Sequence, residues 1–178
     1  MEKFRFPLIL QCLIFLIPLN IYMWGDWMIV NAQWALFRYQ LSEFGSSLIP
    51  GHNDLLYIYL GLTTGFYNIA AALLWTAGAA ILLIGLCITI IAITREEFGK
   101  FKTASNFTII GGIFLCISGI FRFNGGFAIP VGVPVILIIG WWMYQENFEP
   151  DETNEDDVTD EDDDTKEDFA KEEPSAPQ

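Results

Sequence analysis

The 178-residue chain is 53% hydrophobic and 17% charged, and it contains 15 Phe and 6 Trp. Residues 145–178 hold 16 acidic and 2 basic side chains, a net charge of −14, which leaves 6 acidic and 7 basic side chains, or +1, for everything before them. A segment with so little charge cannot cover an apolar core with a soluble surface. The composition indicates an integral membrane protein, with membrane lipids and not nucleic acid around it.

Four long apolar runs mark candidate membrane spans, because about 20 apolar residues of helix are needed to cross the hydrocarbon core. The runs cover residues 6–24, 67–94, 104–121 and 127–144. The sequence therefore predicts an all-α integral membrane protein. Its first part, residues 1–144, is a region of four transmembrane helices, and its last part, residues 145–178, is a disordered acidic tail.

The first run follows two basic residues, Lys3 and Arg5, as the apolar part of a signal peptide does. Small residues are missing where signal cleavage would need them, so we expect an uncleaved membrane anchor. Pro18 has no backbone N–H, and we expect it to kink the helix near its outer end.

The outer loop, residues 25–66, contains an amphipathic pattern. Its large apolar residues recur at steps of three or four, as on one stripe of a helix, and they are Trp27, Val30, Trp34, Phe37, Leu41 and Phe44. The pattern predicts an amphipathic helix over residues 27–44. We expect it to lie on the membrane surface or cap the bundle. The alternative is an exposed face that binds a partner, formed by Trp27, Trp34, Phe37, Leu41 and Phe44.

The 40 residues from Leu55 to Thr94 carry no charge. One straight helix of that length would measure about 60 Å, roughly twice the thickness of the membrane core. Either residues 55–66 lie at the interface before the second span begins, or the segment folds as a hairpin and adds a fifth span. We favour the first arrangement, because a fifth span would place the acidic tail outside.

Basic residues set the expected orientation. Lys3, Arg5, Arg95, Lys100 and Lys102 fall on one side of the four spans, and the other two basic residues of this region fall on the opposite side. The side with more positive charge is normally cytoplasmic. We therefore expect a multi-pass protein of the cell membrane with both termini in the cytoplasm.

Residues that carry chemistry are sparse. The four spans contain no Asp, Glu, His, Lys or Arg, which argues against proton-coupled transport. His52 lies near Glu43 and Asp54 in the sequence, but the spacing matches no known metal site. We expect no catalytic residues, no cofactor and no metal.

Small residues at four-residue spacing, Ala72, Thr76 and Ala80, are candidates for close helix packing. Packing within the bundle is the simpler interpretation, and a homo-oligomer is also possible. The fourth span is irregular, because Pro130, Pro134 and several glycines fall within it or beside it. Broken helices of this kind sometimes line a transport path.

Two functions follow from these features. The leading hypothesis is a non-enzymatic membrane scaffold or accessory subunit, whose acidic tail attracts unidentified, basic protein partners. The alternative is a small transporter or channel subunit with its pathway near the fourth span. The four-span plan with both termini inside resembles that of claudin-like and other tetraspan scaffolds. The outer loop has no Cys pair to match the claudin signature, so no residue's role is carried over.

Overall fold

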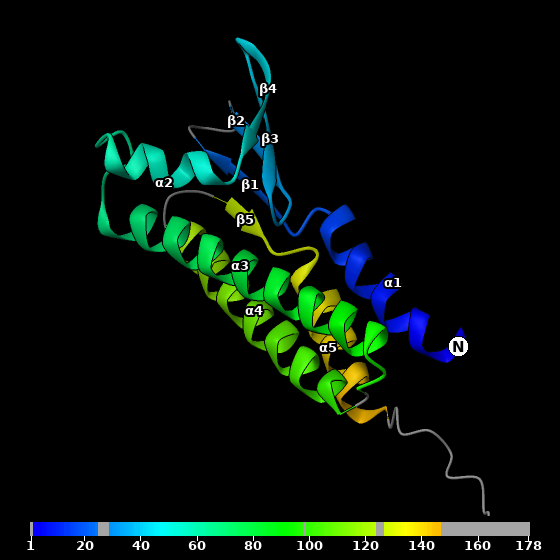
Figure 1. Ribbon diagram of the computed structural model, residues 1–178. Helices are drawn as coiled ribbons and strands as arrows, with labels where there is room; N and C mark the ends of the chain where they lie inside the picture. Colours follow the sequence, from blue (N-terminus) through cyan, green and yellow to red (C-terminus); the bar gives the residue numbers. More distant parts are fainter. Residues whose placement is uncertain (1, 25–28, 98, 124–126, 147–178) are drawn as a thin grey trace, which may run out of the picture.

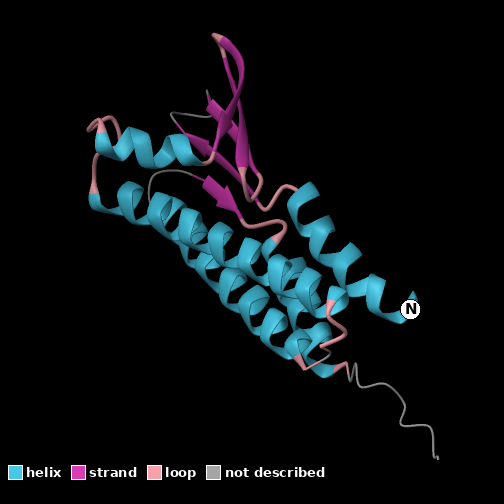
Figure 2. Ribbon diagram, viewed as in Figure 1, coloured by secondary structure: helices cyan, strands magenta, loops and turns pink. Residues whose placement is uncertain are grey.

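The computed structural model describes residues 2–24, 29–97, 99–123 and 127–146. It contains five helices in these ranges: α1 (Glu2–Leu16), α2 (His52–Tyr59), α3 (Phe66–Thr94), α4 (Lys100–Phe123) and α5 (Val133–Gln145). It also contains five strands: β1 (Asn20–Trp24), β2 (Ile29–Gln33), β3 (Phe37–Ser42), β4 (Gly45–Pro50) and β5 (Phe127–Ile129). The sheet and α2 lie at one end of a bundle formed by the other helices, and the N-terminus lies toward the opposite end (Figures 1 and 2).

Two helices of the described chain, α3 with 29 residues and α4 with 24, are long and apolar enough to cross a membrane. At 1.5 Å per residue they measure about 43 and 36 Å, and a hydrocarbon core is about 30 Å thick. The apolar helices beside them are shorter, with 15 residues in α1 and 13 in α5. The four full-length spans predicted from the sequence are therefore not supported, because the first and last apolar runs are each divided between a helix and a strand.

The first apolar run, predicted as one helix over residues 6–24, changes conformation at Pro18. The α1 helix ends at Leu16, and β1 begins at Asn20. A residue that precedes proline avoids the helical conformation, and proline itself has no N–H to donate. Pro18 therefore ends the helix instead of kinking it. The backbone N–H of Leu19 then donates to the carbonyl of Gln33 at 2.8 Å, which starts the sheet.

The last apolar run, predicted as one helix over residues 127–144, is divided in a similar way. Residues Phe127–Ile129 form β5, which pairs antiparallel with β1. Pro130 follows the strand, and α5 begins three residues later at Val133 with a proline in its first turn. Gly132 passes so close to the first part of the chain that an added Cβ would lie 2.8 Å from the carbonyl oxygen of Pro18. Only glycine fits this approach without a shift of the backbone.

The amphipathic helix predicted over residues 27–44 is wrong. Within the described part of this range the chain forms β2 and β3, which belong to an antiparallel sheet of order β4-β3-β2-β1-β5. The strand Phe37–Ser42, with the sequence FRYQLS, alternates strictly between apolar and polar residues, and β2 alternates from Val30 to Gln33. Alternation with a period of two fits a strand with two different faces. The steps of three and four that suggested a helix combine residues of two strands and two turns: Val30 lies in β2, Trp34 in the turn after it, Phe37 and Leu41 in β3, and Phe44 in the turn after β3.

The uncharged segment from Leu55 to Thr94 contains one membrane-length helix. The α2 helix ends at Tyr59, and α3 then runs without interruption from Phe66 to Thr94. Between them Gly61 and Gly65 adopt positive φ angles of 70° and 86°, which glycine adopts readily. The α2 helix has only eight residues, too few to cross a membrane, so the alternative of a two-span hairpin within residues 55–94 is not supported.

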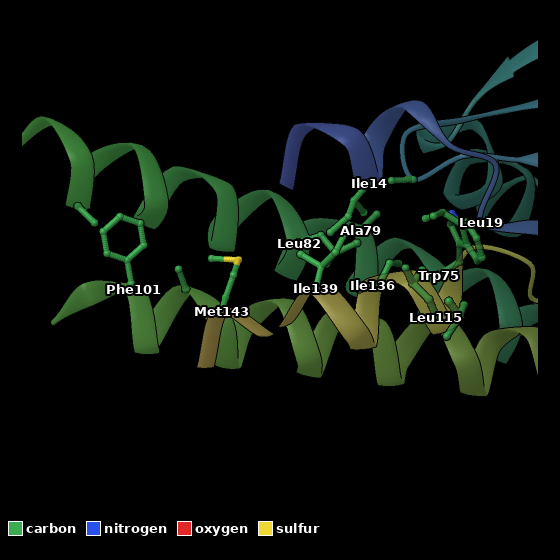
Figure 3. Packing of buried hydrophobic residues seen from close by; sticks show 14 residues of the cluster. Ile14, Leu19, Trp75, Ala79, Leu82, Phe101, Leu115, Ile136, Ile139 and Met143 are labelled. Carbon is green, nitrogen blue, oxygen red and sulfur yellow. The ribbon is translucent and has the colours of Figure 1, made fainter. Parts of the chain in front are cut away.

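The core lies where α3 and α4 pack against each other and against α5 and α1. Its fully buried side chains include Trp75, Leu82 and Leu115, and Figure 3 shows Ile136, Ile139 and Met143 of α5 beside them. Gly78 and Gly111 face each other across the α3–α4 contact, since a Cβ added to either would lie 3.1 Å from the carbonyl oxygen of the other. The two longest helices therefore approach closely at these glycines.

The acidic tail lies outside the described residues from Asn147 onward, and so does Trp27.

Candidate functional site

The sheet is polar on its inner face. Two rows of paired residues cross this face: Tyr22, Asn31 and Gln40 in one, and Asn20, Gln33 and Arg38 in the other. Alternate residues of a strand point to the same side, so these six side chains share one face. Asn20, Tyr22, Asn31 and Gln33 are all at most 4% exposed. The polar side of the sheet is therefore the buried side.

The outer face of the same sheet is apolar. The residues between the polar ones point the other way, and the register aligns Met23, Val30 and Leu41 in one row and Ile21, Ala32, Tyr39 and Leu48 in the next. Several of these side chains are well exposed, at 40% for Tyr39, 50% for Leu41 and 64% for Leu48. A soluble sheet usually shows the reverse arrangement, with apolar residues against the core. We call this set of seven residues the outer apolar face.

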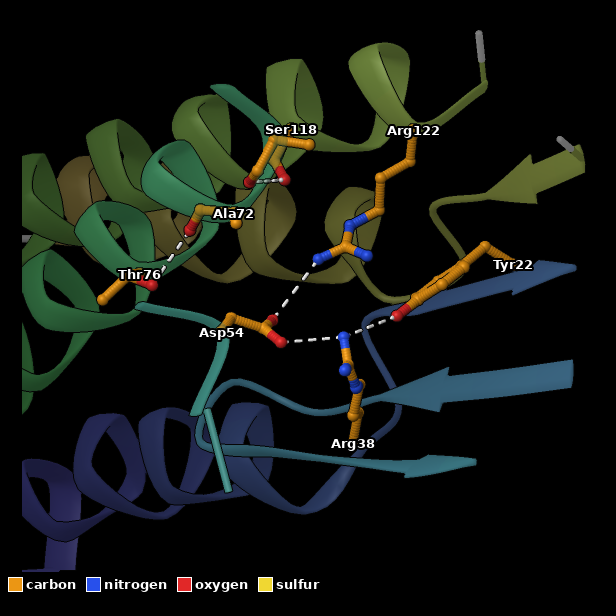
Figure 4. A network of polar contacts seen from close by, with 8 residues as sticks. Tyr22, Arg38, Asp54, Ala72, Thr76, Ser118 and Arg122 are labelled. Atoms are coloured by element: carbon orange, nitrogen blue, oxygen red, sulfur yellow. Dashed lines mark hydrogen bonds and ion pairs between the residues drawn. The ribbon is translucent and has the colours of Figure 1, made fainter. Parts of the chain in front are cut away.

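A cluster of charges lies against the inner face. Asp54 of α2 is 5% exposed, and its carboxylate lies between two guanidinium groups (Figure 4). Its Oδ1 is 2.8 Å from Nη1 of Arg38 on β3, and its Oδ2 is 3.6 Å from Nη2 of Arg122 in the last turn of α4. The shorter contact is within hydrogen-bonding distance, whereas 3.6 Å is too long for a hydrogen bond. The cluster thus joins the sheet, α2 and α4, with Arg122 held less directly than Arg38.

Tyr22 of β1 completes the cluster. Its hydroxyl accepts a hydrogen bond from Nη1 of Arg38 at 3.3 Å. Arg122 lies over the ring, with Cζ 4.4 Å from the ring centroid, so its cation also interacts with the aromatic face. One tyrosine therefore contacts both arginines, and only one carboxylate, that of Asp54, balances their charge within the cluster.

These residues line a pocket of about 260 Å³. Tyr22, Asn31, Asp54 and Arg122 are buried, as are the alanines that α3 contributes. Half-buried side chains complete the lining and leave the pocket within reach of solvent: Ile29, Arg38, Gln40, Thr63 and Asn68. The pocket lies between the sheet and the ends of α3 and α4, on the side where α2 crosses.

The predicted partner-binding residues do not form one helical stripe. Trp34 stacks on Phe37 with ring centroids 4.9 Å apart, and its Nε1 donates to the carbonyl of Leu16 at 3.0 Å. Leu41 belongs to the outer apolar face, and Phe44 is fully exposed in the turn between β3 and β4. Trp34 thus anchors the sheet to the end of α1, while Leu41 and Phe44 are open to contact.

The predicted packing residues of α3 occupy different environments. Ala72 is buried at 5% exposure and lines the pocket, Thr76 is half-buried, and Ala80 is exposed. Thr76 donates its hydroxyl to the carbonyl of Ala72 at 2.9 Å within the same helix. Their role in an oligomer stays a prediction.

In the sequence, Arg38 and Arg122 are the two basic residues on the side opposite the cytoplasmic one and bore only on orientation, and Asp54 bore only on a metal site. A signal was nevertheless present, because Arg122 is the single charged residue between Lys102 and Glu146. A lone arginine at the end of an apolar helix indicates a specific partner. Within the described ranges, no group of three His, Cys, Asp or Glu side chains is placed to hold a metal ion.

Comparison with known proteins gives no assignment, since no family model, curated protein or solved structure matches the chain.

Proposed function

We propose that this chain is a non-enzymatic, multi-pass membrane scaffold or accessory subunit that binds a partner protein through the outer apolar face of its sheet. The observation that carries the proposal is the exposure of Tyr39, Leu41 and Leu48 on a sheet whose polar residues are buried. Large exposed apolar patches on proteins mark interaction sites, because their burial on association is favourable.

The position of this face favours a partner outside the bilayer. The strands β3 and β4 extend away from the helical bundle in Figure 1, beyond the end at which α2 crosses. Phe44 at the tip of this hairpin is fully exposed. An aromatic residue that projects beside aliphatic ones is a typical anchor of a protein interface.

The proposed topology is four-pass, with α1 and α5 inserted beside α3 and α4. It is supported by the direction of the chain, because α1 leads into the sheet, α3 starts from α2, α4 leads to β5 and α5 starts after β5. Each of the four helices therefore has one end next to the sheet and its other end at the far side of the bundle: α1 and α4 meet the sheet with their C-terminal ends, and α3 and α5 with their N-terminal ends. The basic residues Arg95, Lys100 and Lys102 lie at the other end, which would be cytoplasmic. The acidic tail would then be a second, cytoplasmic segment for basic partners.

A transporter or channel subunit is the alternative, and its expected pathway was the Gly-rich fourth span. Neighbouring groups fill the space beside two of these glycines. A Cβ at Gly140 would lie 2.7 Å from Cγ1 of Ile109, and one at Gly132 would lie 2.9 Å from the Leu19 side chain. No specific observation therefore favours this alternative over a scaffold.

The proposal is tested by photocrosslinking in the native membrane. A photoreactive phenylalanine at Leu41 should form protein adducts, and the same group at Lys102, which is exposed at the opposite end of the bundle, serves as the matched control. Leu41→Lys together with Leu48→Glu should abolish the adduct of a probe at Phe44. These two side chains are exposed, so stability should change by no more than about 0.5 kcal/mol.

Two results would count against the proposal. Adducts with lipid alone at Leu41 would show that the outer apolar face meets the membrane surface and not a protein. Equal protein adducts at Leu41 and Lys102 would show that the crosslinks are non-specific. An adduct with a second copy of the chain would identify the partner as the chain itself.

A further inference from the structure

The charged pocket beneath the sheet has an unbalanced charge. Among its lining residues, the guanidinium groups of Arg38 and Arg122 carry two positive charges, and Asp54 carries one negative charge. One positive charge therefore remains without a counterpart in the lining. Arg122 is only 6% exposed, so water does not screen this charge as it would at an open surface.

The hydrogen-bonding groups of the pocket are also incompletely used. Within the described residues, Nε of Arg38 and Nε of Arg122 are buried donors without a hydrogen-bond partner, and Oδ1 of Asn31 is a buried acceptor without one. Buried polar atoms normally have partners, because leaving one unpaired costs about 1–3 kcal/mol. The hydrogen-bonding capacity of the lining is therefore not used up by contacts within the described part of the protein.

We infer that this pocket binds a small organic carboxylate that also carries a hydrogen-bond donor. A planar carboxylate accepts two parallel hydrogen bonds from a guanidinium group, which suits the under-used Arg122. Its single charge matches the single excess positive charge, whereas Asp54 would repel a dianion such as phosphate. An N–H or O–H of the same molecule would donate to a side-chain oxygen at the half-buried rim, on Gln40, Thr63 or Asn68.

The remaining lining sets the size and character of the ligand. The volume of about 260 Å³ is slightly below the range of about 300–1,000 Å³ that is usual for ligand pockets, so the guest is small. Gln40, Thr63 and Asn68 supply amide and hydroxyl groups at the half-buried rim. Ala71 and Ala72 offer a short apolar surface inside. This lining suits a free hydroxy acid, or equally the carboxyl terminus of a peptide.

The test measures binding to the full-length protein in detergent micelles by isothermal titration calorimetry at constant ionic strength. Glycolate represents the free solute and glycolamide is its uncharged control. An acetylated Ala-Ala-Gly peptide with a free carboxylate represents the peptide terminus, and its C-terminal amide is the control. At least one carboxylate should bind about 10- to 100-fold more tightly than its amide, since hydrogen bonds to charged groups contribute about 1.5–3 kcal/mol. Equal affinity within both pairs would overturn the inference, and so would tighter binding of inorganic phosphate.

Two substitutions separate a ligand site from a purely structural cluster. Asp54→Asn raises the excess charge of the pocket from one to two, so it should tighten carboxylate binding about tenfold or more even though it removes an ion pair. Arg122→Gln should weaken binding about tenfold or more, whereas Arg95→Gln in the exposed α3–α4 connection should leave it unchanged. Unchanged or weaker binding in Asp54→Asn would overturn the inference. This variant and the wild-type acid and amide pairs still decide the question if Arg122→Gln does not fold.

Discussion

The guanidinium group of Arg122 lies over the ring of Tyr22 where the helical bundle meets the sheet, with Cζ of the arginine 4.4 Å from the centroid of the ring. Arg122 lies in the last turn of the long helix α4, and Tyr22 lies in the middle of the strand β1. Asp54 of α2 reaches the same point at 3.6 Å from Arg122. The inner face of the sheet is polar because it packs against a charged cluster at the end of the bundle as well as against apolar residues.

We expect Tyr22→Leu to destabilise the fold by about 1–2 kcal/mol, because the substitution removes a buried cation–π contact together with a hydrogen bond. Tyr22→Phe keeps the ring and should cost about 0.5–1 kcal/mol, since it loses only the hydroxyl group. The free energy of unfolding, measured by titration with a denaturing detergent, provides the comparison. Tyr59→Leu is the control, because this tyrosine is 86% exposed and its replacement should change little. Equal losses for Tyr22→Leu and Tyr22→Phe would show that the ring contact contributes nothing.

The proposed topology gives a direct prediction about the two ends of the bundle. Reporters of membrane sidedness placed at Glu97 and at the C-terminus should both be cytoplasmic, and a reporter near Asn53 on α2 should be external. The reason is that the basic residues near Glu97 are retained in the cytoplasm during insertion. A cytoplasmic Asn53 would show that the sheet faces the cell interior, and an external C-terminus would exclude an insertion of four passes.

The sequence allowed the helical part of the fold to be predicted better than the sheet. The α3 helix was predicted at residues 67–94 and runs over Phe66–Thr94, because a long uncharged run can form little else in a membrane. The strands β2 and β3 were missed although Phe37–Ser42 alternates with a period of two. Apolar residues at steps of three or four were counted across a turn, so two short strands resembled one helix.

The charged cluster was harder to foresee, because it depends on contacts between distant parts of the chain. Arg38, Asp54 and Arg122 lie on three different elements, and the whole of α3 and most of α4 separate Asp54 from Arg122 in the sequence. No local sequence pattern predicts that these three side chains come into contact. Pro18 and Pro130 were noted, but their consequence was underestimated, since each separates a helix from a strand: Pro18 lies between α1 and β1, and Pro130 lies between β5 and α5.

The acidic tail gives a prediction that separates stability from binding. Truncation after Pro150 should leave the midpoint of thermal unfolding nearly unchanged, because the removed segment has too few apolar residues to bury a core. Capture of basic partners by the intact protein should weaken as salt rises, since charges are screened over about 8–10 Å near physiological ionic strength. Replacement of its acids by Asn and Gln should have the same effect as deletion. Capture that survives truncation would assign the interaction to the helices and the sheet.

Glu97 in the α3–α4 connection gives a prediction about pH. Lys100 donates a hydrogen bond to its carboxylate, and this contact lowers the pKa of Glu97 below the ordinary value of 4.5. A lowered pKa means that the contact stabilises the fold above pH 4.5 and that this contribution is lost as the pH falls through the folded-state pKa. Titration of a carboxyl-labelled Glu97 by NMR should show the lowered pKa, and Lys100→Gln should raise it toward 4.5. The effect on stability should be small, because the pair is exposed to solvent.

The closest approach of α3 and α4 gives the last prediction. At Gly78 an added Cβ would lie 3.0 Å from Cγ of Leu115 and 3.1 Å from the carbonyl oxygen of Gly111, so Gly78→Ala must push the helices apart. Overpacking of this kind typically costs about 1–3 kcal/mol, and we expect a loss in that range in the free energy of unfolding. Gly99→Ala is the matched control, since nothing lies within 4 Å of a Cβ at that position. Because α3 and α4 also carry the residues that line the pocket, Gly78→Ala should weaken the ion pair between Asp54 and Arg122. A variant as stable as the Gly99→Ala control would show that the helices can separate without cost and that this glycine contact does not position the sheet.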